Sequence, residues 1–463
     1  MHLPNEAPDR HAFDRRSFLR IGSCAALGAL ATAKAQSANQ PQGAPDVTLR
    51  IGKVSWEVAP GKTLKTTGFN GSSPGPLVRL REGQQVTIEV ANETDATDLV
   101  HWHGLHIPSA VDGAMEEGTP MIPAHASRQY SFIAQPNGTR WYHTHMMAGR
   151  DLRRATYSGE FGFLCIDPKS EPGAYDQEFF LAFREWDPYM TNGGEGDDSM
   201  NVAYKYCSVN SHALGFGEPV RVKQGQRILF RMLNASATVH RRIAFSGHRF
   251  RVVSLDGNSI PEPKEADVLE LGAAERIDAL VEMNQPGVWI LGATDDHDRQ
   301  QGLGIVVEYA NQSSAPQWLT PSRARWDYRA FSSNQAHSFP AGIRVPLVFE
   351  KKWAGNRWLD HWTINGKSYP KTDPILIKPN ETYRLVFDNR SDEAHPVHLH
   401  RHTFELVEVE GAATSGIRKD VVVVGPRQKM EVEFKATNPG PTLFHCHQQM
   451  HMDYGFMALL KYV

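Results

Sequence analysis

Hydrophobic and polar residues alternate in the same way at three places along the chain, and each place predicts short β-strands. These segments are Gly75–Gly83, Glu218–Gly225 and Asp373–Asn380, and each closes on a turn residue. Each is followed by a second alternating stretch that ends nine positions later in an asparagine, at Asn92, Asn234 and Asn389. Alternation with a period of two indicates strands with one buried face, and its recurrence indicates an internal repeat.

The far end of the repeat recurs as well. The segment Gly138–His143 matches Gly440–His445, and the middle copy carries Gly287–Ala293 there, without histidines. Short alternating strands separated by Gly, Pro and Asn turns are typical of Greek-key sandwiches or barrels. We therefore predict an all-β chain of three domains joined in part by a linker rich in Ser, Gln, Arg and Pro. The domains span residues 46–170, 175–312 and 341–463, and the linker spans 313–340.

The bulk composition describes an ordinary soluble protein. The chain has 463 residues, a formal net charge of −3 and 22% charged residues. Near-neutrality without a basic stripe argues against a nucleic-acid partner. No stretch is apolar over the roughly 20 residues that a membrane-spanning helix needs, so we expect no membrane insertion.

The N-terminus carries a targeting signal. Arg15 and Arg16 form a twin-arginine pattern, which precedes the short apolar run Ile21–Ala33 and a possible cleavage site at Ala35. We predict a signal peptide over residues 1–35, recognised by the twin-arginine export machinery, and a periplasmic mature protein. The alternative is a chance pair of arginines in a cytosolic chain.

Cleavage there would remove one of the four cysteines. It takes away Cys24 and leaves Cys165, Cys207 and Cys446. If Cys446 binds a metal, Cys165 and Cys207 could form a disulfide in an oxidising compartment. The alternative, which is slightly favoured, is a pair of free buried thiols.

Histidines gather in four short clusters. These clusters are His101-Trp102-His103-Gly104, His143-Thr144-His145, His395-Pro396-Val397-His398-Leu399-His400 and His445-Cys446-His447-Gln448-Gln449-Met450-His451. Together they hold ten of the 21 histidines. A single His-Cys-His segment is as typical of a buried core strand as of a metal site, but chance does not account for four clusters.

Strand parity divides these donors into two sets. Neighbouring side chains on a strand point to opposite faces, so Cys446 points away from His445 and His447. The cluster that begins at His395 divides in the same way. The two sets are His395, Cys446 and His451 on one side, and His398, His400, His445 and His447 on the other. The second set needs partners, which the first domain supplies. Thiolate with imidazoles is a copper-type donor set.

In this order, the four motifs resemble the signatures of the multicopper oxidases, the family of the laccases, over essentially the whole mature chain. The resemblance implies three cupredoxin-like domains and four copper ions: one of type 1, one of type 2 and two of type 3. The implied ligands are His395, Cys446 and His451 for type 1; His101 and His398 for type 2; His103, His143 and His447 for one type 3 copper; and His145, His400 and His445 for the other.

The resemblance also indicates residues around the metals. Phe456, ten residues after Cys446, takes the type 1 axial position that is Met in many relatives; the alternative is a register error with Met457 as ligand. Asp112 is the candidate acid for delivering protons near the type 2 copper. Many bacterial relatives carry a second acid directly after the last type 1 histidine, where this chain has Met452, so that relay stays unassigned.

Three other features stand out. His240 follows Asn234 by six residues, as His395 follows Asn389, and we predict a structural histidine there.

The middle domain is then expected to act as a spacer that lines one wall of the substrate site. Asp392 and Glu393, just before His395, are expected on a solvated turn; the alternative is that they bias the charge of the substrate near the site of electron entry. Arg401 replaces the glycine usual after the third cluster.

The implied activity couples one-electron oxidation of phenols or aromatic amines to four-electron reduction of dioxygen to water. Electrons would pass from the type 1 site through Cys446 to the other coppers. A small-molecule or metal-ion reductant and dioxygen are the expected partners. The alternatives are a metal oxidase that acts on Cu(I) for copper tolerance, a copper-free scaffold protein built from the same domains and, more weakly, a copper nitrite reductase.

Overall fold

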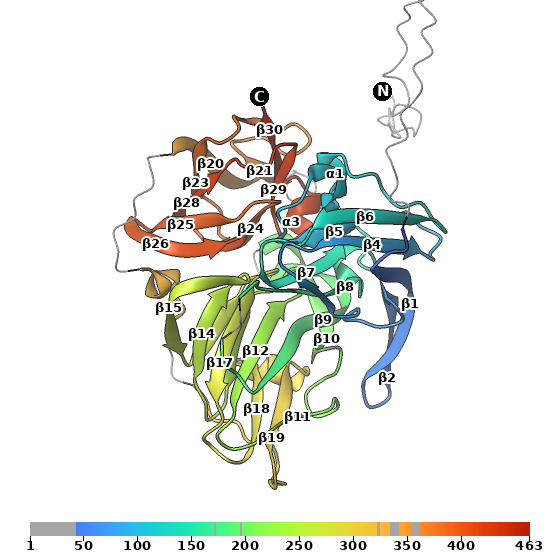
Figure 1. Cartoon of the computed structure of the whole chain (residues 1–463), viewed down its shortest axis with the longest axis vertical. Coiled ribbons are helices and arrows are strands. Elements are labelled where there is room, and N and C mark those ends of the chain that lie inside the picture. Colours follow the sequence, from blue (N-terminus) through green and yellow to red (C-terminus); the bar gives the residue numbers. More distant parts are fainter. Residues whose placement is uncertain (1–42, 171–172, 195–196, 322–324, 334–341, 353–360) are drawn as a thin grey trace, which may run out of the picture. The chain divides into compact units, whose positions relative to one another are not determined.

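The computed structural model describes residues 43–170, 173–194, 197–321, 325–333, 342–352 and 361–463. Within this part of the chain, six β-sheets hold nearly all of the regular structure, which confirms the predicted all-β class (Figure 1). The predicted signal peptide and part of the predicted linker lie outside the described residues.

The first pair of sheets lies between residues 47 and 167. One sheet has the order β2-β1-β4-β6 and the other has the order β3-β8-β7-β5. The strands are β1 (Val47–Ala59), β2 (Lys62–Phe69), β3 (Val78–Arg81), β4 (Gln85–Asn92), β5 (Val100–His103), β6 (Ser127–Ile133), β7 (Gly138–Thr144) and β8 (Phe161–Asp167). Ile88 of β4 and Trp102 of β5 belong to one buried core, so the two sheets pack face to face.

The middle pair of sheets lies between residues 177 and 309, with the orders β10-β9-β12-β17-β14-β15 and β11-β19-β18-β13-β16. The strands are β9 (Gln177–Gly194), β10 (Asp197–Val209), β11 (Val220–Val222), β12 (Arg227–Asn234), β13 (Arg241–Phe245), β14 (Phe250–Leu255), β15 (Asn258–Ala266), β16 (Val268–Leu271), β17 (Arg276–Glu282), β18 (Val288–Ala293) and β19 (Gly304–Tyr309).

The third pair lies between residues 343 and 462, with the orders β21-β20-β23-β28-β25-β26 and β22-β30-β29-β24-β27. The strands are β20 (Ile343–Lys352), β21 (His361–Ile364), β22 (Ile375–Ile377), β23 (Thr382–Asn389), β24 (His395–Leu399), β25 (Phe404–Val409), β26 (Ala412–Lys419), β27 (Val421–Val424), β28 (Lys429–Lys435), β29 (Thr442–Cys446) and β30 (Met457–Tyr462).

The repeated asparagines have a common structural role. Each ends a strand (β4, β12 or β23) that runs parallel to the strand opening its pair of sheets. Its buried side-chain amide donates to a carbonyl in the next loop: Asn92 to Ala96 over 2.7 Å, and Asn389 to Glu393 over 2.8 Å. The buried amide thus needs a partner and finds it in the backbone of the following loop, which accounts for the asparagine in every copy.

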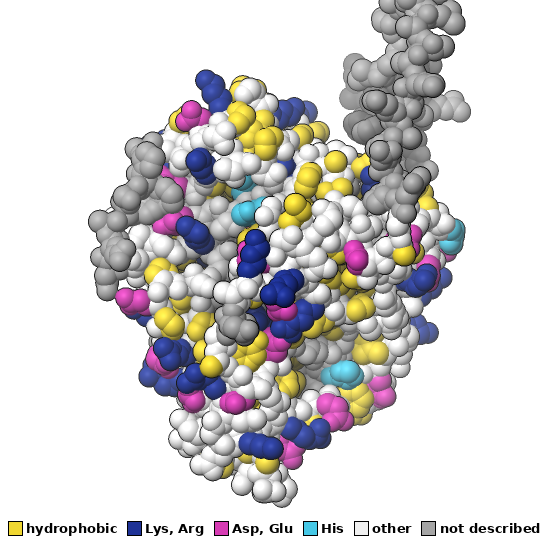
Figure 2. Space-filling view, in the orientation of Figure 1, with side chains coloured by type: hydrophobic (Ala, Val, Ile, Leu, Met, Phe, Trp, Pro, Cys, Tyr) yellow, Lys and Arg dark blue, Asp and Glu magenta, His cyan; other side chains and the backbone are white. Residues whose placement is uncertain are grey.

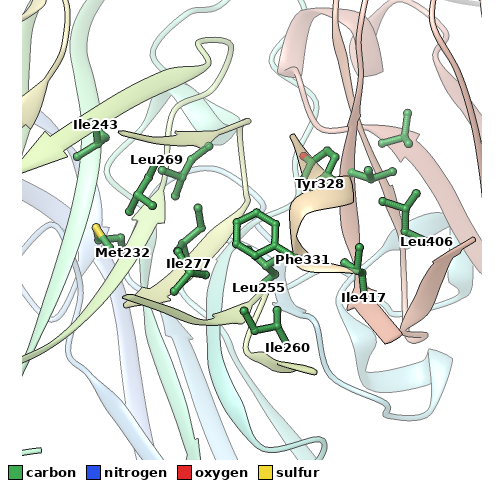
Figure 3. Close-up of a cluster of buried hydrophobic side chains, with 14 of the residues drawn as sticks. Met232, Ile243, Leu255, Ile260, Leu269, Ile277, Tyr328, Phe331, Leu406 and Ile417 are labelled. Atoms are coloured by element: carbon green, nitrogen blue, oxygen red, sulfur yellow. The ribbon is translucent and has the colours of Figure 1, made fainter. Parts of the chain in front are cut away.

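A 3-10 helix in the predicted linker is part of the core. This helix, η4 (Tyr328–Phe331), carries the buried rings of Tyr328 and Phe331. Figure 3 shows this short helix between the strands of the middle pair of sheets that carry Leu255 and Ile260 and the strands of the third pair that carry Leu406 and Ile417, and all of these residues belong to one buried cluster. One turn of 3-10 helix produces no hydrophobic alternation, so the sequence pattern predicted only a linker there.

Cys165 of β8 and Cys207 of β10 are buried and unpaired, which agrees with the favoured alternative of free thiols. Burial raises the pKa of Cys165 to about 11 and that of Cys207 to about 12, so both stay protonated at neutral pH.

The surface carries charges of both signs. On the face that Figure 2 shows, Lys and Arg side chains are interspersed with Asp and Glu. Among the described residues, no helix combines the length and the apolar character that crossing a membrane requires.

Candidate metal centre

Eight buried histidines from the first and third pairs of sheets meet in one cage. Their donor atoms form three groups, and within each group all atoms lie within 4.8 Å of one another. The groups are His101 with His103 and His398; His103 with His143 and His447; and His145 with His400 and His445. The structure thus brings together both triads that the resemblance implies for type 3 coppers, and the pair that it implies for type 2.

Strand pairing builds this cage. Antiparallel pairing of β5 with β7 sets His101 opposite His143, and pairing of β24 with β29 sets His398 opposite His445. The predicted i, i+2 spacing then keeps the next histidine of each cluster on the same side.

Most cage histidines are held from outside through Nδ1. Nδ1 donates to a backbone carbonyl at 2.7–2.9 Å in four of them: His101 to Asp112, His143 to Thr144, His398 to Asp420 and His445 to Cys446. A hydrogen on Nδ1 leaves the lone pair on Nε2, the inner nitrogen.

Among the described residues, several nitrogens that point into the cage lack hydrogen-bond partners, which is typical of a metal site. Nε2 of His101, His143 and His398 is buried without any hydrogen-bond partner in the described part of the chain. Buried polar atoms are rarely left in this state. Convergent imidazole lone pairs are suitable ligands for copper, so these residues fit the implied ions.

Burial lowers the pKa of seven histidines of the cage, which keeps these seven neutral. It is the largest cause that lowers the pKa of His145 and of His398, each to about 3. The pKa values of five further histidines lie well below 6.5 for the same reason: His103, His143, His400, His445 and His447. Neutral imidazoles can bind a metal without first releasing a proton.

The second donor set is smaller and contains sulfur. Cys446 Sγ lies 3.4 Å from His451 Nδ1 and 3.7 Å from His395 Nδ1. The outer nitrogens are again engaged, since His395 Nε2 hydrogen-bonds to Ser391 and His451 Nε2 donates to Glu393. His451 sits on a short helix, α3 (Gln449–Asp453), which turns it back toward the sulfur.

Phe456 closes this sulfur site from one side. Its ring centroid is 4.8 Å from that of His395, and its side chain is fully buried. Met457 packs instead with Leu443 and Met452 in a separate cluster. Phe456 thus lies beside His395 of the sulfur site, whereas Met457 lies in another cluster; Phe456 as the axial residue stays a prediction.

Asp112 lies at the cage, and a second acid that sequence reasoning missed lies beside it. Asp112 Oδ2 accepts from His400 Nδ1 over 2.8 Å. Glu117 Oε1 is 3.5 Å from the same nitrogen and accepts from the backbone of Leu443 over 2.6 Å. Burial, and then Asp112, raise the pKa of Glu117 well above its usual value. No spacing signal in its loop pointed to this residue.

Two residues near the motifs have roles that the structure explains: Asp453, which follows the Met452 found where many relatives have an acid, and Arg401, which replaces the usual glycine. Asp453 Oδ2 accepts from the backbone N–H of Ala148 and Gly149, at 3.1 and 2.7 Å, so it ties α3 to the first pair of sheets. Arg401 has a φ of 60°, a conformation that favours glycine, and its buried guanidinium donates to carbonyls such as that of Pro441 at 2.8 Å.

A cavity of about 400 Å³ opens beside His451, lined also by Trp362 and by His240 from the middle pair of sheets. Glu393 lies there too, and it differs from the expected solvated turn. It accepts from His451 Nε2 over 3.0 Å and from Lys351 over 2.9 Å. Although burial raises the pKa of Glu393, these two bonds bring it down to about 2.

Known proteins share this architecture. Three family models, each described as multicopper oxidase, match residues 50–171, 181–312 and 345–462. The multicopper oxidase MmcO of Mycobacterium tuberculosis is 29% identical over 520 aligned positions that cover 100% of both chains. Laccase-2 of Fomitopsis schrenkii is 25% identical, over 95% of this chain and 93% of its own. The crystal structure of Fet3p, a multicopper oxidase that functions in iron import, superposes with a TM-score of 0.76 at 20% identity and covers 90% of each chain.

Proposed function

This chain belongs to the multicopper oxidase family, and from that premise we propose that it is a laccase-like enzyme. It couples one-electron oxidation of phenols or aromatic amines to the four-electron reduction of dioxygen to water. The main observation behind this proposal is that strand β29 joins two sets of possible metal ligands. One set contains the Cys446 sulfur, and the other consists of imidazoles. The match to a laccase over nearly the whole chain supports the same activity.

The ligand sets assigned from the sequence are proposed for four copper ions. His395, Cys446 and His451 would hold the type 1 copper; His101 and His398 the type 2 copper; and His103, His143, His447 and His145, His400, His445 the two type 3 coppers. Bound copper ions would each take up one electron, so that four of them match the four electrons that dioxygen needs.

Cys446 connects the two sites. Its sulfur faces His395 and His451, whereas its neighbours His445 and His447 turn into the cage. The connection therefore consists of a few covalent bonds within one buried segment. Such a path favours the transfer of single electrons from the outer site to the inner one.

The cavity beside His451 is the proposed site of the reductant. The Trp362 ring centroid is 4.1 Å from that of His451, and 6% of the His451 side chain remains exposed. A flat aromatic ring could stack against this wall and contact the imidazole edge.

Oxidation of Cu(I) is the second candidate and is less favoured. Met450 is the only methionine among the described residues that line the cavity, and soft cuprous ions prefer several sulfur donors. Turnover of a phenol and of Cu(I) by the same preparation separates the candidates: cuprous turnover that far exceeds phenol turnover would reject the laccase-like assignment.

The twin-arginine signal is also part of the proposal. Arg15 and Arg16 precede a short apolar run, and we assign the mature enzyme to the periplasm. Replacing both arginines with lysine should retain the precursor in the cytoplasm, as cell fractionation would measure. Unchanged export would contradict the assignment.

The decisive experiment is a copper count on the purified protein with visible and electron paramagnetic resonance spectra. We expect four coppers per chain and an intense blue thiolate band. A chain that binds no copper after reconstitution would overturn the proposed function.

A further inference from the structure

A single buried aspartate contacts ligands of two different proposed metals. Asp420 lies between β26 and β27 and is fully buried. Its carboxylate accepts from His103 Nε2 over 3.1 Å, and its backbone carbonyl accepts from His398 Nδ1 over 2.7 Å. His103 comes from the first pair of sheets and His398 from the third. Their rings stack with centroids 3.9 Å apart.

This contact sets the orientation of His103, which is an exception in the cage. His101 and His143 are held through Nδ1 and offer Nε2. His103 is held through Nε2, and its Nδ1 is buried without a partner in the described part of the chain. Because a carboxylate only accepts hydrogen bonds, the hydrogen of His103 stays on Nε2 and the lone pair stays on Nδ1.

The position of the Asp420 carboxylate is set by an arginine from the middle pair of sheets. Arg276, at the start of β17, donates from Nη1 to Oδ1 and from Nη2 to Oδ2, both over 2.6 Å. This two-bond geometry fixes the carboxylate plane, which a single point charge could not do. Arg140 of β7 adds one longer bond of 3.2 Å to Oδ2.

The glycine of the first histidine motif makes room for this network. A Cβ at Gly104 would lie 2.7 Å from Asp420 Oδ2 and 2.9 Å from Arg276 Nη2. The residue also has a φ of +83°, a conformation that favours glycine. The motif that carries His103 is therefore shaped around the Arg276–Asp420 pair.

We propose that Arg276 is a positioning residue of the three-metal cage, acting through Asp420 on His103. The proposal rests on the proposed copper enzyme and extends it. The middle pair of sheets supplies none of the metal-ligand groups found among the described residues, yet it completes the cage by fixing the direction of one ligand. Its role is thus more than that of the spacer predicted from the sequence.

The test replaces Arg276 with lysine, which keeps the charge and loses the two-bond geometry. Replacing a residue that hydrogen-bonds to a metal ligand typically lowers metal affinity by about 10- to 100-fold. We expect a chelator to remove the cage coppers from Arg276→Lys at a concentration at least about 10-fold lower than from the wild type. The blue type 1 copper should leave at an unchanged concentration.

Arg231→Lys is the matched control. Arg231 belongs to the same sheet, is buried, and donates to Asp278 over 3.2 Å and to Thr139 over 3.0 Å, without touching Asp420. Equal copper loss in this variant, or full copper retention in Arg276→Lys, would overturn the proposal. If the wild type itself binds no copper, the proposed function fails instead.

A second variant keeps the proposal testable in case Arg276→Lys folds poorly. Asp420→Asn keeps the size of the side chain, and ¹⁵N spectra of histidine in the copper-free protein report which ring nitrogen carries the hydrogen. We expect His103 to carry it on Nε2 in the wild type and to populate both tautomers in Asp420→Asn. A single unchanged tautomer in the variant would contradict the positioning role.

Discussion

Asp112 accepts a hydrogen bond from His400, with 2.8 Å between its Oδ2 and Nδ1 of the histidine. The same oxygen lies 3.1 Å from His101 Nδ1, so one carboxylate links proposed ligands from the first and third pairs of sheets. The other oxygen, Oδ1, is buried and receives no N–H hydrogen bond among the described residues, and the neighbouring acid Glu117 interacts with this carboxylate. If dioxygen binds in the cage, this carboxylate would be placed to pass protons toward it, which is the role expected of Asp112 from the sequence.

Replacing Asp112 with asparagine should therefore slow dioxygen reduction and spare the uptake of electrons. General acid catalysis contributes about 10²- to 10⁴-fold, so turnover should fall within that range. Rapid mixing with a phenol should still bleach the blue band at the wild-type rate. Asp95→Asn is the control, because that side chain is 83% exposed. Normal turnover in Asp112→Asn would exclude a role in proton delivery.

Replacing Cys446 with serine should remove the blue colour and abolish turnover. The cage ligands point to the other side of the segment, so three coppers per chain should remain. Metal analysis and electron paramagnetic resonance check this. A variant that stays blue would disprove the assignment of the sulfur ligand.

Replacing Phe456 with methionine should lower the reduction potential of the type 1 copper. A thioether in that position would donate to Cu(II), whereas the present ring, 4.8 Å from the His395 ring, does not. Redox titration of the blue band measures the change. Met457→Leu should leave the potential unchanged, because Met457 packs in a separate cluster. The opposite pattern would mean that Met457 is the axial residue.

His106 should make the copper-free protein less stable in mild acid. Burial lowers its pKa to about 4 in the folded chain, against about 6.5 when unfolded. Between these values the unfolded chain binds one more proton, so stability falls as the pH falls. From pH 7 to pH 5 this loss amounts to about 2 kcal/mol.

The variant His106→Gln carries no titrating group and can keep a bond to Thr403 Oγ1, which is 2.9 Å from His106 Nε2. Denaturant unfolding at both pH values should show a pH dependence weaker than that of the wild type by that amount. His297→Gln, at an exposed position, should behave like the wild type. A parallel loss of stability in His106→Gln would contradict the expected linkage.

The fold class and the composition of both donor sets could be predicted because their signals are local. Alternation predicted strands, and parity within β24 and β29 separated His395 from His398 and Cys446 from His445. The order of the four motifs, through the resemblance to the multicopper oxidases, then indicated which histidines of the first domain share a site with which histidines of the third. The strand register in the structure follows the same parity.

The residues that support the ligands could not be predicted from such patterns. Asp420 is 317 positions from His103, and Arg276 is 144 positions from Asp420. Contacts at that distance leave no periodicity, and an arginine at the start of β17 resembles any strand-end charge. The helix α3 was missed as well, because five residues are too few to show a helical pattern.

Half of the cage is encoded before residue 146 and the other half after residue 397, so the ribosome delivers the two halves at widely separated times. The first four imidazoles have no partners until β24 brings His398 and His400, and the cage is complete only when His445 and His447 have been added. If the cage binds the proposed coppers, complete loading would follow the synthesis of its last histidine. A chain that ended before Cys446 would lack the sulfur of one proposed site and His447 of the cage, so both proposed sites would be incomplete.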